Sequence, residues 1–246
     1  MLARRMKISV IVPAFNEAKL IAATLRSIRA ATAAFASLGW DSELIACDNN
    51  STDGTADLAR AEGATVVFEP VNQIARARNH GAAAATGQWL LFVDADSRAS
   101  RELFAAVAEQ IQSGHCVGGG STIKLDEPHF WLNLFTASWN LVSRLTKWAA
   151  GSFIFCEAAA FREVGGFNLA LFAGEELDLS RRLKKLARRR RWRFVILRQA
   201  PLVTSARKAR LYTFGELLPV FLRAVFTPKR FMQDRSQCGM WYDGRR

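Results

Sequence analysis

Short apolar runs alternate with stretches of helical spacing along the first half of the chain. Runs rich in β-branched and aromatic residues occupy positions 7–13, 43–47, 64–68 and 89–93. Each run is followed by turn-forming or helix-starting residues, which is the pattern of buried strands in a parallel sheet. The alternation of strand and helix therefore predicts an α/β fold around a mostly parallel sheet.

Helices are expected between and after these strands. Residues 73–85 and 100–113 have helical spacing, and the second stretch has Ser100 as its N-terminal cap and Gly114 just past its end. Residues 115–125 are expected to form another strand. It contains three consecutive glycines, which we interpret as a bend or a close approach of the backbone to a neighbouring group.

The second half of the chain is less regular. Residues 130–148 and 214–226 each predict an amphipathic helix, with large apolar side chains on one face and cations nearby. Packing on the core is the commonest explanation for such a face. Aromatic residues beside cations are also typical of helices that lie on a membrane surface, so the pattern leaves both interpretations open.

Acidic residues gather where predicted strands end. Glu17 follows the first strand, Asp48 follows the second, and Asp94 and Asp96 follow the fourth. In open α/β sheets ligands bind beyond the carboxyl ends of the strands. Mg²⁺ is commonly bound by one or two carboxylates together with substrate phosphates. The acids therefore favour a nucleotide-diphosphate substrate over a chance pair of aspartates in a solvated turn.

The composition fits one large domain with an excess of positive charge. The chain has 246 residues, a net charge of +12 and no linker-like stretch. Such a charge attracts nucleic acid, anionic membranes or phosphorylated substrates. Much of it lies at 181–193, where Trp192 is the only aromatic residue; single-strand binders interleave several, so nucleic acid is disfavoured. A phosphate- or lipid-facing patch and a solvated helix end both stay open.

The cysteines and the hydropathy bear on localisation. Four widely spaced cysteines and three histidines indicate neither a zinc site nor a disulfide framework, which favours a reducing compartment. No stretch reaches the roughly 18 uninterrupted apolar residues that span a bilayer. We expect a cytoplasmic protein, and the amphipathic helices suggest peripheral contact with the inner face of a membrane.

Several motifs follow one another in a fixed order. They are VPAFNE at 12–17, DNNSTDG at 48–54, RNHG at 78–81, ATG at 85–87, FVDAD at 92–96, GGFN at 165–168 and GEELDL at 174–179. Together they resemble glycosyltransferase family 2, whose members are inverting enzymes with a GT-A fold that use nucleotide-activated sugars. The resemblance implies a single GT-A-type, Rossmann-like domain with a mixed, mostly parallel sheet flanked by helices and a helical C-terminal extension.

The resemblance also implies an organisation along the chain. The glycosyltransferase domain would cover residues 1–210, with a nucleotide-binding half at 7–97 and an acceptor half at 98–210. Residues 211–246 would form an amphipathic extension, packed on the domain or at a membrane surface.

The resemblance implies these nucleotide-binding residues: Pro13, Phe15, Glu17, Asp48, Arg78, Asp94 and Arg207. Asp48 would accept the imide N–H of uracil, Asp94 would approach the ribose, and Arg207 would be an extra contact to the diphosphate. Asp96 would hold Mg²⁺ or Mn²⁺, which bridges the phosphates and stabilises the departing nucleoside diphosphate. A UDP-sugar is the favoured donor and a GDP-sugar the second choice.

Inverting transfer needs a base that removes the proton of the acceptor hydroxyl. The resemblance implies Glu176 for this role, with Glu175, Gly151 and Asp178 around the acceptor. The family usually has aspartate at the position of Glu176, and one added methylene shifts the carboxylate. The alternative is that the acidic cluster only starts a helix with favourable charge and that Asp178 pairs with an arginine one turn later.

Two positions depart from the family pattern. Asn49 stands where many relatives carry a second aspartate, and Thr204-Ser205 stand where metal-dependent relatives often supply a histidine. The metal shell is therefore expected to be incomplete on the protein side or filled by water.

Other classes of protein fit the pattern less well. A sugar-phosphate nucleotidyltransferase and a dinucleotide-dependent oxidoreductase both need a glycine-rich loop after the first strand, and residues 13–17 contain no glycine. A non-catalytic polyanion- or membrane-binding protein on the same fold stays open as the alternative. The favoured activity is transfer of a sugar to a hydroxyl of a glycan or a lipid-linked acceptor.

Overall fold

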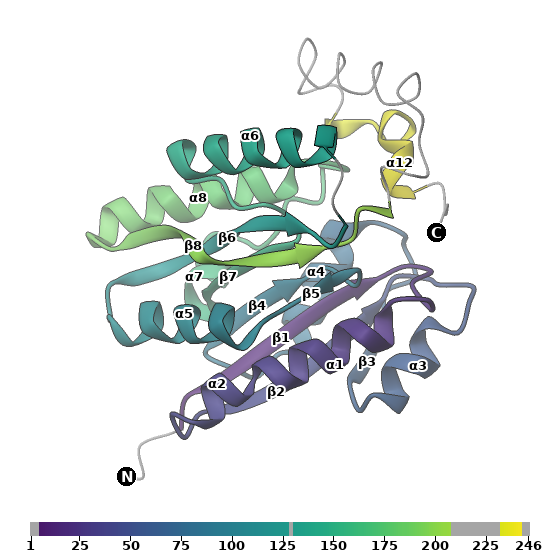
Figure 1. Cartoon of the computed structure of the whole chain (residues 1–246), viewed down its shortest axis with the longest axis horizontal. Helices are drawn as coiled ribbons and strands as arrows, with labels where there is room; N and C mark the ends of the chain where they lie inside the picture. The colour runs from purple at the N-terminus through teal and green to yellow at the C-terminus, as the bar shows by residue number, and fades with distance from the viewer. Residues whose placement is uncertain (1–4, 128–129, 208–231, 243–246) are drawn as a thin grey trace.

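The computed structural model describes residues 5–127, 130–207 and 232–242, and the helix predicted at 214–226 lies outside them. An eight-stranded sheet of order β3-β2-β1-β4-β7-β6-β8-β5 forms the centre of the described chain (Figure 1). The strands are β1 Lys7–Ala14, β2 Asp41–Asp48, β3 Thr65–Phe68, β4 Trp89–Val93, β5 Ser97–Arg98, β6 Cys116–Leu125, β7 Phe153–Glu157 and β8 Arg193–Thr204. The helices are α1 Ile21–Ala31, α2 Ala33–Ala36, α3 Thr55–Ala61, α4 Ile74–Ala84, α5 Arg101–Gln112, α6 Phe130–Thr146, α7 Ala158–Glu163, α8 Glu175–Arg190, the 3-10 helix η1 Arg235–Cys238 and α12 Gly239–Tyr242.

The sheet is mixed, as expected. β1 pairs in parallel with β2 and with β4, and β2 pairs in parallel with β3. β7 then runs antiparallel between β4 and β6, while β6 and β8 are parallel to each other. The carboxyl ends of β1, β2 and β4 therefore meet at one edge, and the start of the reversed strand β7 reaches the same edge.

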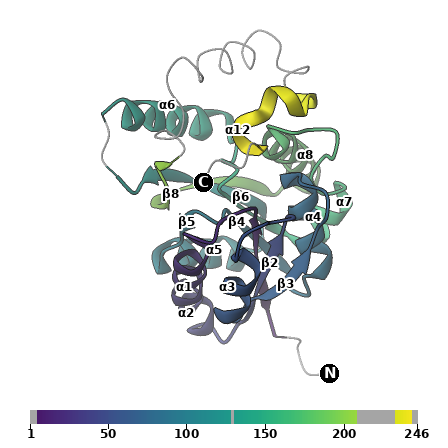
Figure 2. The same cartoon turned by 90° about the vertical axis from the view of Figure 1, so that its right-hand side faces the viewer.

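The central strands are buried on both faces, which explains their continuous apolar runs. Along β4, Trp89, Leu91 and Val93 belong to one hydrophobic cluster, shared with α1, α2 and α5. The alternate residues Leu90 and Phe92 belong to a second cluster, shared with α7 and α8. The two sets of helices thus cover opposite faces of the sheet (Figure 2).

The helix predictions agree with the structure to within two residues. Residues 73–85 and 100–113 are realised as α4 and α5, and the Ser100 hydroxyl caps α5 by accepting a hydrogen bond from the backbone N–H of Leu103 at 3.2 Å. The amphipathic stretch 130–148 is realised as α6. No helix in the described part of the chain is both long and apolar enough to cross a bilayer.

The three glycines of β6 make a close approach to the neighbouring strands. A Cβ added to Gly118 would meet the Phe155 carbonyl of β7, and one added to Gly119 would meet the Val195 carbonyl of β8. The expected close approach is therefore confirmed, but these two glycines contact the sheet rather than an acceptor surface.

Candidate active site

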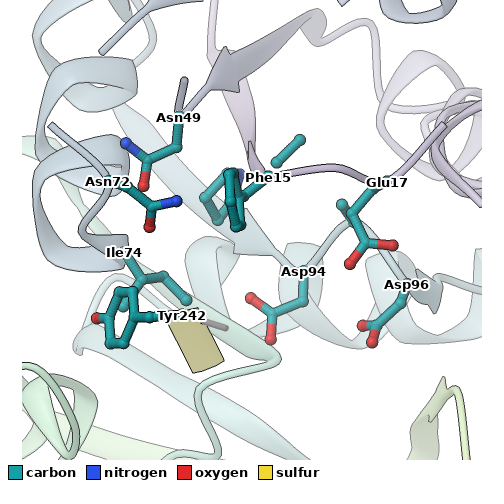
Figure 3. Close-up of a pocket in the computed structure, with 11 residues that line it drawn as sticks. Phe15, Glu17, Asn49, Asn72, Ile74, Asp94, Asp96 and Tyr242 are labelled. Atoms are coloured by element: carbon teal, nitrogen blue, oxygen red, sulfur yellow. The ribbon is translucent and has the colours of Figure 1, made fainter. Parts of the chain in front are cut away.

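A pocket opens where β1, β2 and β4 end (Figure 3). It encloses about 530 Å³, including its open mouth. The residues that line it are Pro13, Ala14, Phe15, Glu17, Asn49, Asn72, Ile74, Asp94, Ala95, Asp96 and Tyr242. The acids Glu17, Asp94 and Asp96 gather at one end, as their positions after β1 and β4 predict.

Arg207 lies beside the acidic end of this pocket. Its Nη2 donates to both carboxylate oxygens of Glu17, at 2.8 and 2.9 Å, and lies 3.9 Å from a carboxylate oxygen of Asp96. Its Nε and Nη1 atoms are buried and have no acceptor in the described structure. Because buried donors are nearly always paired, these two atoms call for an anionic ligand.

The carboxylates of Asp94 and Asp96 fit a hard divalent cation, which prefers oxygen ligands. Both side chains line the pocket, and no described residue donates a hydrogen bond to the Asp96 carboxylate. Within the described ranges no group of three or more His, Cys, Asp or Glu side chains is arranged around one point. A divalent cation held by these two carboxylates would take its remaining ligands from substrate phosphates or water.

Asp48, the expected uracil contact, is not among the described residues that line the pocket. One of its carboxylate oxygens accepts the backbone N–H of Ser51 at 3.1 Å, which fixes the turn after β2. Asn49 lines the pocket instead. The contact of Asp48 with uracil stays a prediction.

The side chain of Asn49 both donates and accepts hydrogen bonds. Its amide nitrogen donates to the carbonyls of Glu69 and Val71, at 3.2 and 2.7 Å, and its oxygen accepts the backbone N–H of Gln73 at 2.9 Å. An aspartate could not donate the first two bonds. The asparagine at this departure from the family pattern therefore fixes the loop between β3 and α4.

Arg78, expected to line the nucleotide pocket, is buried behind it. Its side chain is 2% exposed, and its Nη2 donates to Asp94 at 2.9 Å and to the Gly151 carbonyl at 2.7 Å. Its Nη1 donates to Glu175 at 2.7 Å. Arg78 thus connects an acid of the nucleotide pocket with the start of α8.

A second cavity adjoins the first and shares Ile74 and Asp94 with it. Its lining includes Gly151, Glu175 and Glu176, which the resemblance assigned to the acceptor and to catalysis. Asp178 is not part of that described lining. Its carboxylate accepts a hydrogen bond from Arg182 at 2.8 Å, four residues later on α8, as the structural alternative predicted for it.

The two glutamates at the start of α8 share one cation. Burial raises the pKa of Glu175, and the Arg78 guanidinium opposes that rise. Burial and then the negative charge of Glu175 raise the pKa of Glu176 to about 8. A carboxyl group with a pKa near the working pH is suited to exchange a proton with a substrate hydroxyl.

Two residues of the first pocket have no place in any motif. Asn72 comes from the loop before α4, and Tyr242 comes from the C-terminal helix α12. The Tyr242 hydroxyl donates to the Phe172 carbonyl at 3.0 Å, which ties α12 to the loop before α8. Neither residue is predicted from the sequence, because no local pattern marks it.

Comparison with known proteins identifies the class that this fold and site define. The sequence profile of "Glycosyl transferase family 2" matches residues 9–164, more than half of the chain. The chain therefore belongs to glycosyl transferase family 2.

Curated relatives match in sequence over part of their length. An uncharacterized glycosyltransferase of Mycobacterium tuberculosis is 34% identical over 113 residues, which cover 46% of this chain and 47% of that protein. One of Rickettsia prowazekii is 31% identical over 97 residues, 39% of this chain and 30% of that protein. The matched stretch spans less than half of these relatives.

Solved structures share the fold. The mannosyltransferase PcManGT from Pyrobaculum calidifontis, in complex with GDP-Man and Mn²⁺, has a TM-score of 0.63 at 20% identity over 89% of this chain and 61% of that one. The glucosyl-3-phosphoglycerate synthase from Mycobacterium tuberculosis, in complex with Mn²⁺, UDP and phosphoglyceric acid, has a TM-score of 0.61 at 19% identity, over 96% and 79%. At these identities the likeness establishes the GT-A fold.

Proposed function

We propose that the protein is an inverting glycosyltransferase that moves a sugar from a nucleotide-diphosphate sugar, UDP-linked first and GDP-linked second, to a hydroxyl of a glycan or lipid-linked acceptor. The observation that carries this proposal is the pair of adjoining cavities. One presents Asp94 and Asp96, the other presents Glu175 and Glu176, and Arg78 donates hydrogen bonds to one acid of each set, Asp94 and Glu175. A donor in the first cavity would place its sugar toward the second.

The chain's own residues support each half of an inverting displacement. Glu176 takes the proton of the acceptor hydroxyl while that oxygen forms a bond to the anomeric carbon. The bond from that carbon to the diphosphate breaks on the opposite face, and its electron pair leaves with the nucleoside diphosphate. The unpaired Nε and Nη1 of Arg207 are available to the negative charge that develops there. A divalent cation bound by Asp96 would add positive charge at the same place.

Thermal-shift titration tests the donor half of the proposal. UDP, GDP, CDP and dTDP are each added with and without Mn²⁺ to the wild type, to Asp96→Asn and to the control Asp57→Asn. Asp57 is an exposed residue of α3. We expect one nucleotide to raise the melting temperature in the presence of Mn²⁺, because a ligand that binds only the folded state stabilises it. Asp96→Asn should abolish this shift and Asp57→Asn should retain it. No shift with any nucleotide would contradict the donor site.

A second proposal concerns the exposed surface of α6. Leu134, Leu141, Val142 and Leu145 are 40–76% exposed on this helix. Beside its C-terminal end, Lys184 of α8 donates to the Thr146 carbonyl at 2.6 Å. Apolar side chains next to uncompensated cations fit an anionic lipid surface.

The cations near the end of α6 form a cluster. Burial and the charges of Arg188, Arg181 and Lys147 lower the pKa of Lys184. In the described structure none of these neighbours forms an ion pair with a carboxylate. Anionic lipid phosphates would reduce the repulsion among these cations. We therefore propose that α6 and this cluster hold the enzyme on an anionic membrane.

Liposome flotation tests this surface. The wild type should float with vesicles that contain phosphatidylserine and stay at the bottom with pure phosphatidylcholine. Leu141→Gln/Leu145→Gln should reduce flotation severalfold, while Leu58→Gln, at an exposed position of α3, should leave it unchanged. Wild-type protein that stays at the bottom with both vesicles would refute the membrane proposal and leave the transferase proposal intact.

A further inference from the structure

The non-acidic end of the nucleotide pocket contains an unused carboxamide. Figure 3 shows Glu17, Asp94 and Asp96 on one side of Phe15, and Asn49, Asn72, Ile74 and Tyr242 on the other. If the phosphates of a nucleoside diphosphate lie against the acids and Arg207, its base extends toward this second group. The inference that follows rests on the proposed donor site and adds the means by which it selects the base.

Of the polar side chains at this end, Asn49 is committed to the protein. It uses both amide donors and its oxygen on the loop between β3 and α4. Asn72 is partly buried, and its side-chain amide makes no hydrogen bond to any described residue. In Figure 3 its amide nitrogen points toward Phe15 and the pocket interior. It therefore offers one donor face and one acceptor face to a ligand.

Tyr242 presents a ring whose polar atom is already used. Its hydroxyl donates to the Phe172 carbonyl at 3.0 Å, and the Arg235 guanidinium lies 5.5 Å from its ring centroid. The surrounding segment is fixed as well, because the Phe172 N–H donates to the Met232 carbonyl at 2.6 Å. The rest of the ring forms an apolar wall beside Ile74 in the pocket.

We propose that Asn72 reads the hydrogen-bonding edge of the donor nucleobase and that Tyr242 forms an apolar wall of the base site. A carboxamide matches a base edge that has a donor and an acceptor side by side, such as N3–H and O4 of uracil. A carboxylate accepts only, so it matches two adjacent donors, such as N1–H and the exocyclic amine of guanine. The segment at 232–242 then belongs to the donor site, although it is far from every family motif in the sequence.

Isothermal titration calorimetry with UDP and GDP in the presence of Mn²⁺ tests the reading of the base. Asn72→Ala should weaken binding of the preferred nucleotide about tenfold, because two hydrogen bonds are lost. Asn72→Asp should lower the ratio of UDP to GDP affinity at least tenfold relative to the wild type. Asn133→Asp makes the same chemical change at an exposed position of α6 and should alter neither affinity.

Two Tyr242 variants test the wall. Tyr242→Ala should lower the affinities for UDP and for GDP by about tenfold each, because contact with an aromatic ring is tolerant of base identity. Tyr242→Phe retains the ring and loses only the hydroxyl, so both affinities should stay within about twofold. A melting curve for each variant identifies any that fail to fold, and Asn72→Ser replaces Asn72→Asp in that case, with the same expected loss as Asn72→Ala.

The outcomes separate this inference from the proposed function. If the wild type binds UDP or GDP but folded Asn72 variants have its affinities and its UDP-to-GDP ratio, Asn72 does not read the base and the inference is overturned. Unchanged affinities in Tyr242→Ala overturn the wall in the same way. If the wild type binds neither nucleotide, the donor site itself is absent and both proposals fall.

Discussion

The two halves of the candidate site are built from different kinds of sequence. The donor pocket takes most of its lining from segments that directly follow β1, β2 and β4, so its residues lie in short motifs at strand ends. The acceptor cavity draws on the approach to β7, the start of α8 and α6, which are separated by long stretches of chain. A local motif can therefore specify the first half, whereas only the tertiary fold assembles the second.

The two halves also differ in how charge is balanced. At the donor pocket, Arg207 contacts Glu17 and approaches Asp96, and Arg78 pairs with Asp94. In the acceptor cavity, Glu175 and Glu176 are adjacent in sequence and share the field of Arg78, which forms an ion pair with Glu175. Glu176 is the acid whose raised pKa suits it to accept a proton in the proposed reaction.

The largest expected effect comes from removing that proton acceptor. Glu176→Gln keeps the shape of the side chain but cannot take a proton, so kcat should fall by about 10²–10⁴. Binding of the nucleoside diphosphate should change by less than about twofold, because Glu176 lines the other cavity. Steady-state kinetics and calorimetry on the same preparation measure both quantities.

Glu109→Gln, at an exposed position of α5, is the control for this variant and should retain full activity. In the wild type, kcat should rise with pH through a midpoint near 8, since Glu176 acts only after it loses its proton. An active Glu176→Gln enzyme, or a flat pH profile between 6 and 9, would show that another group accepts the proton.

Removing the shared cation should break the connection between the halves. Arg78→Met removes the ion pairs of Arg78 with Asp94 and with the buried Glu175, which should lower the free energy of unfolding by about 3–5 kcal/mol. Urea denaturation measures the change. Arg60→Met removes an exposed ion pair on α3 and should cost less than about 1 kcal/mol. Equal effects of the two substitutions would mean that Arg78 is not the link we describe.

A substitution at Arg207 tests the donor pocket alone. Arg207→Met removes the two unpaired donors, so the binding free energy of UDP should become less favourable by about 2 kcal/mol. Uridine, which has no phosphate, should bind the variant and the wild type equally. Calorimetry with UDP, UMP and uridine measures the difference, and an equal loss for all three ligands would place Arg207 away from the diphosphate.

The smallest effect concerns stability and pH. The pKa of Glu176 is raised to about 8 from an ordinary value of 4.5. The folded state therefore binds more protons than the unfolded state between these values, and the free energy of unfolding falls as pH rises from about 4.5 to 8. Glu176→Gln should be more stable than the wild type by about 1–2 kcal/mol at pH 9, after allowance for partial exposure. The two proteins should be equally stable at pH 4, and a variant that is less stable at pH 9 would contradict the raised pKa.

The sequence predicted the strand-ending acids well, because short loops leave little freedom in where Glu17, Asp94 and Asp96 can point. It failed where the partner of a side chain comes from a distant segment. The position of Arg78 on a predicted helix does not reveal that its side chain bonds to Gly151 and Glu175.

Two strands and one residue illustrate the same limit. β7 and β8 were not predicted: β8 mixes arginine and glutamine into its apolar pattern, and β7 lies in the less regular second half of the chain. Tyr242 reaches the pocket only because residues 232–242 fold back on the loop before α8. No periodicity carries that information.

The reversed direction of β7 has a consequence for how this enzyme could diversify. The excursion from Asp126 to Ser152, which contains α6, leaves the sheet at the end of β6 and re-enters it at the start of its antiparallel neighbour β7, at the same edge. Its start is anchored by the bonds of Asp126 to Thr204 and Ala206, and its end by the bond from the Asp94 N–H to the Ser152 carbonyl. Insertions, deletions or grafted segments between these anchors can therefore replace the surface on the acceptor side without moving the residues of the donor pocket.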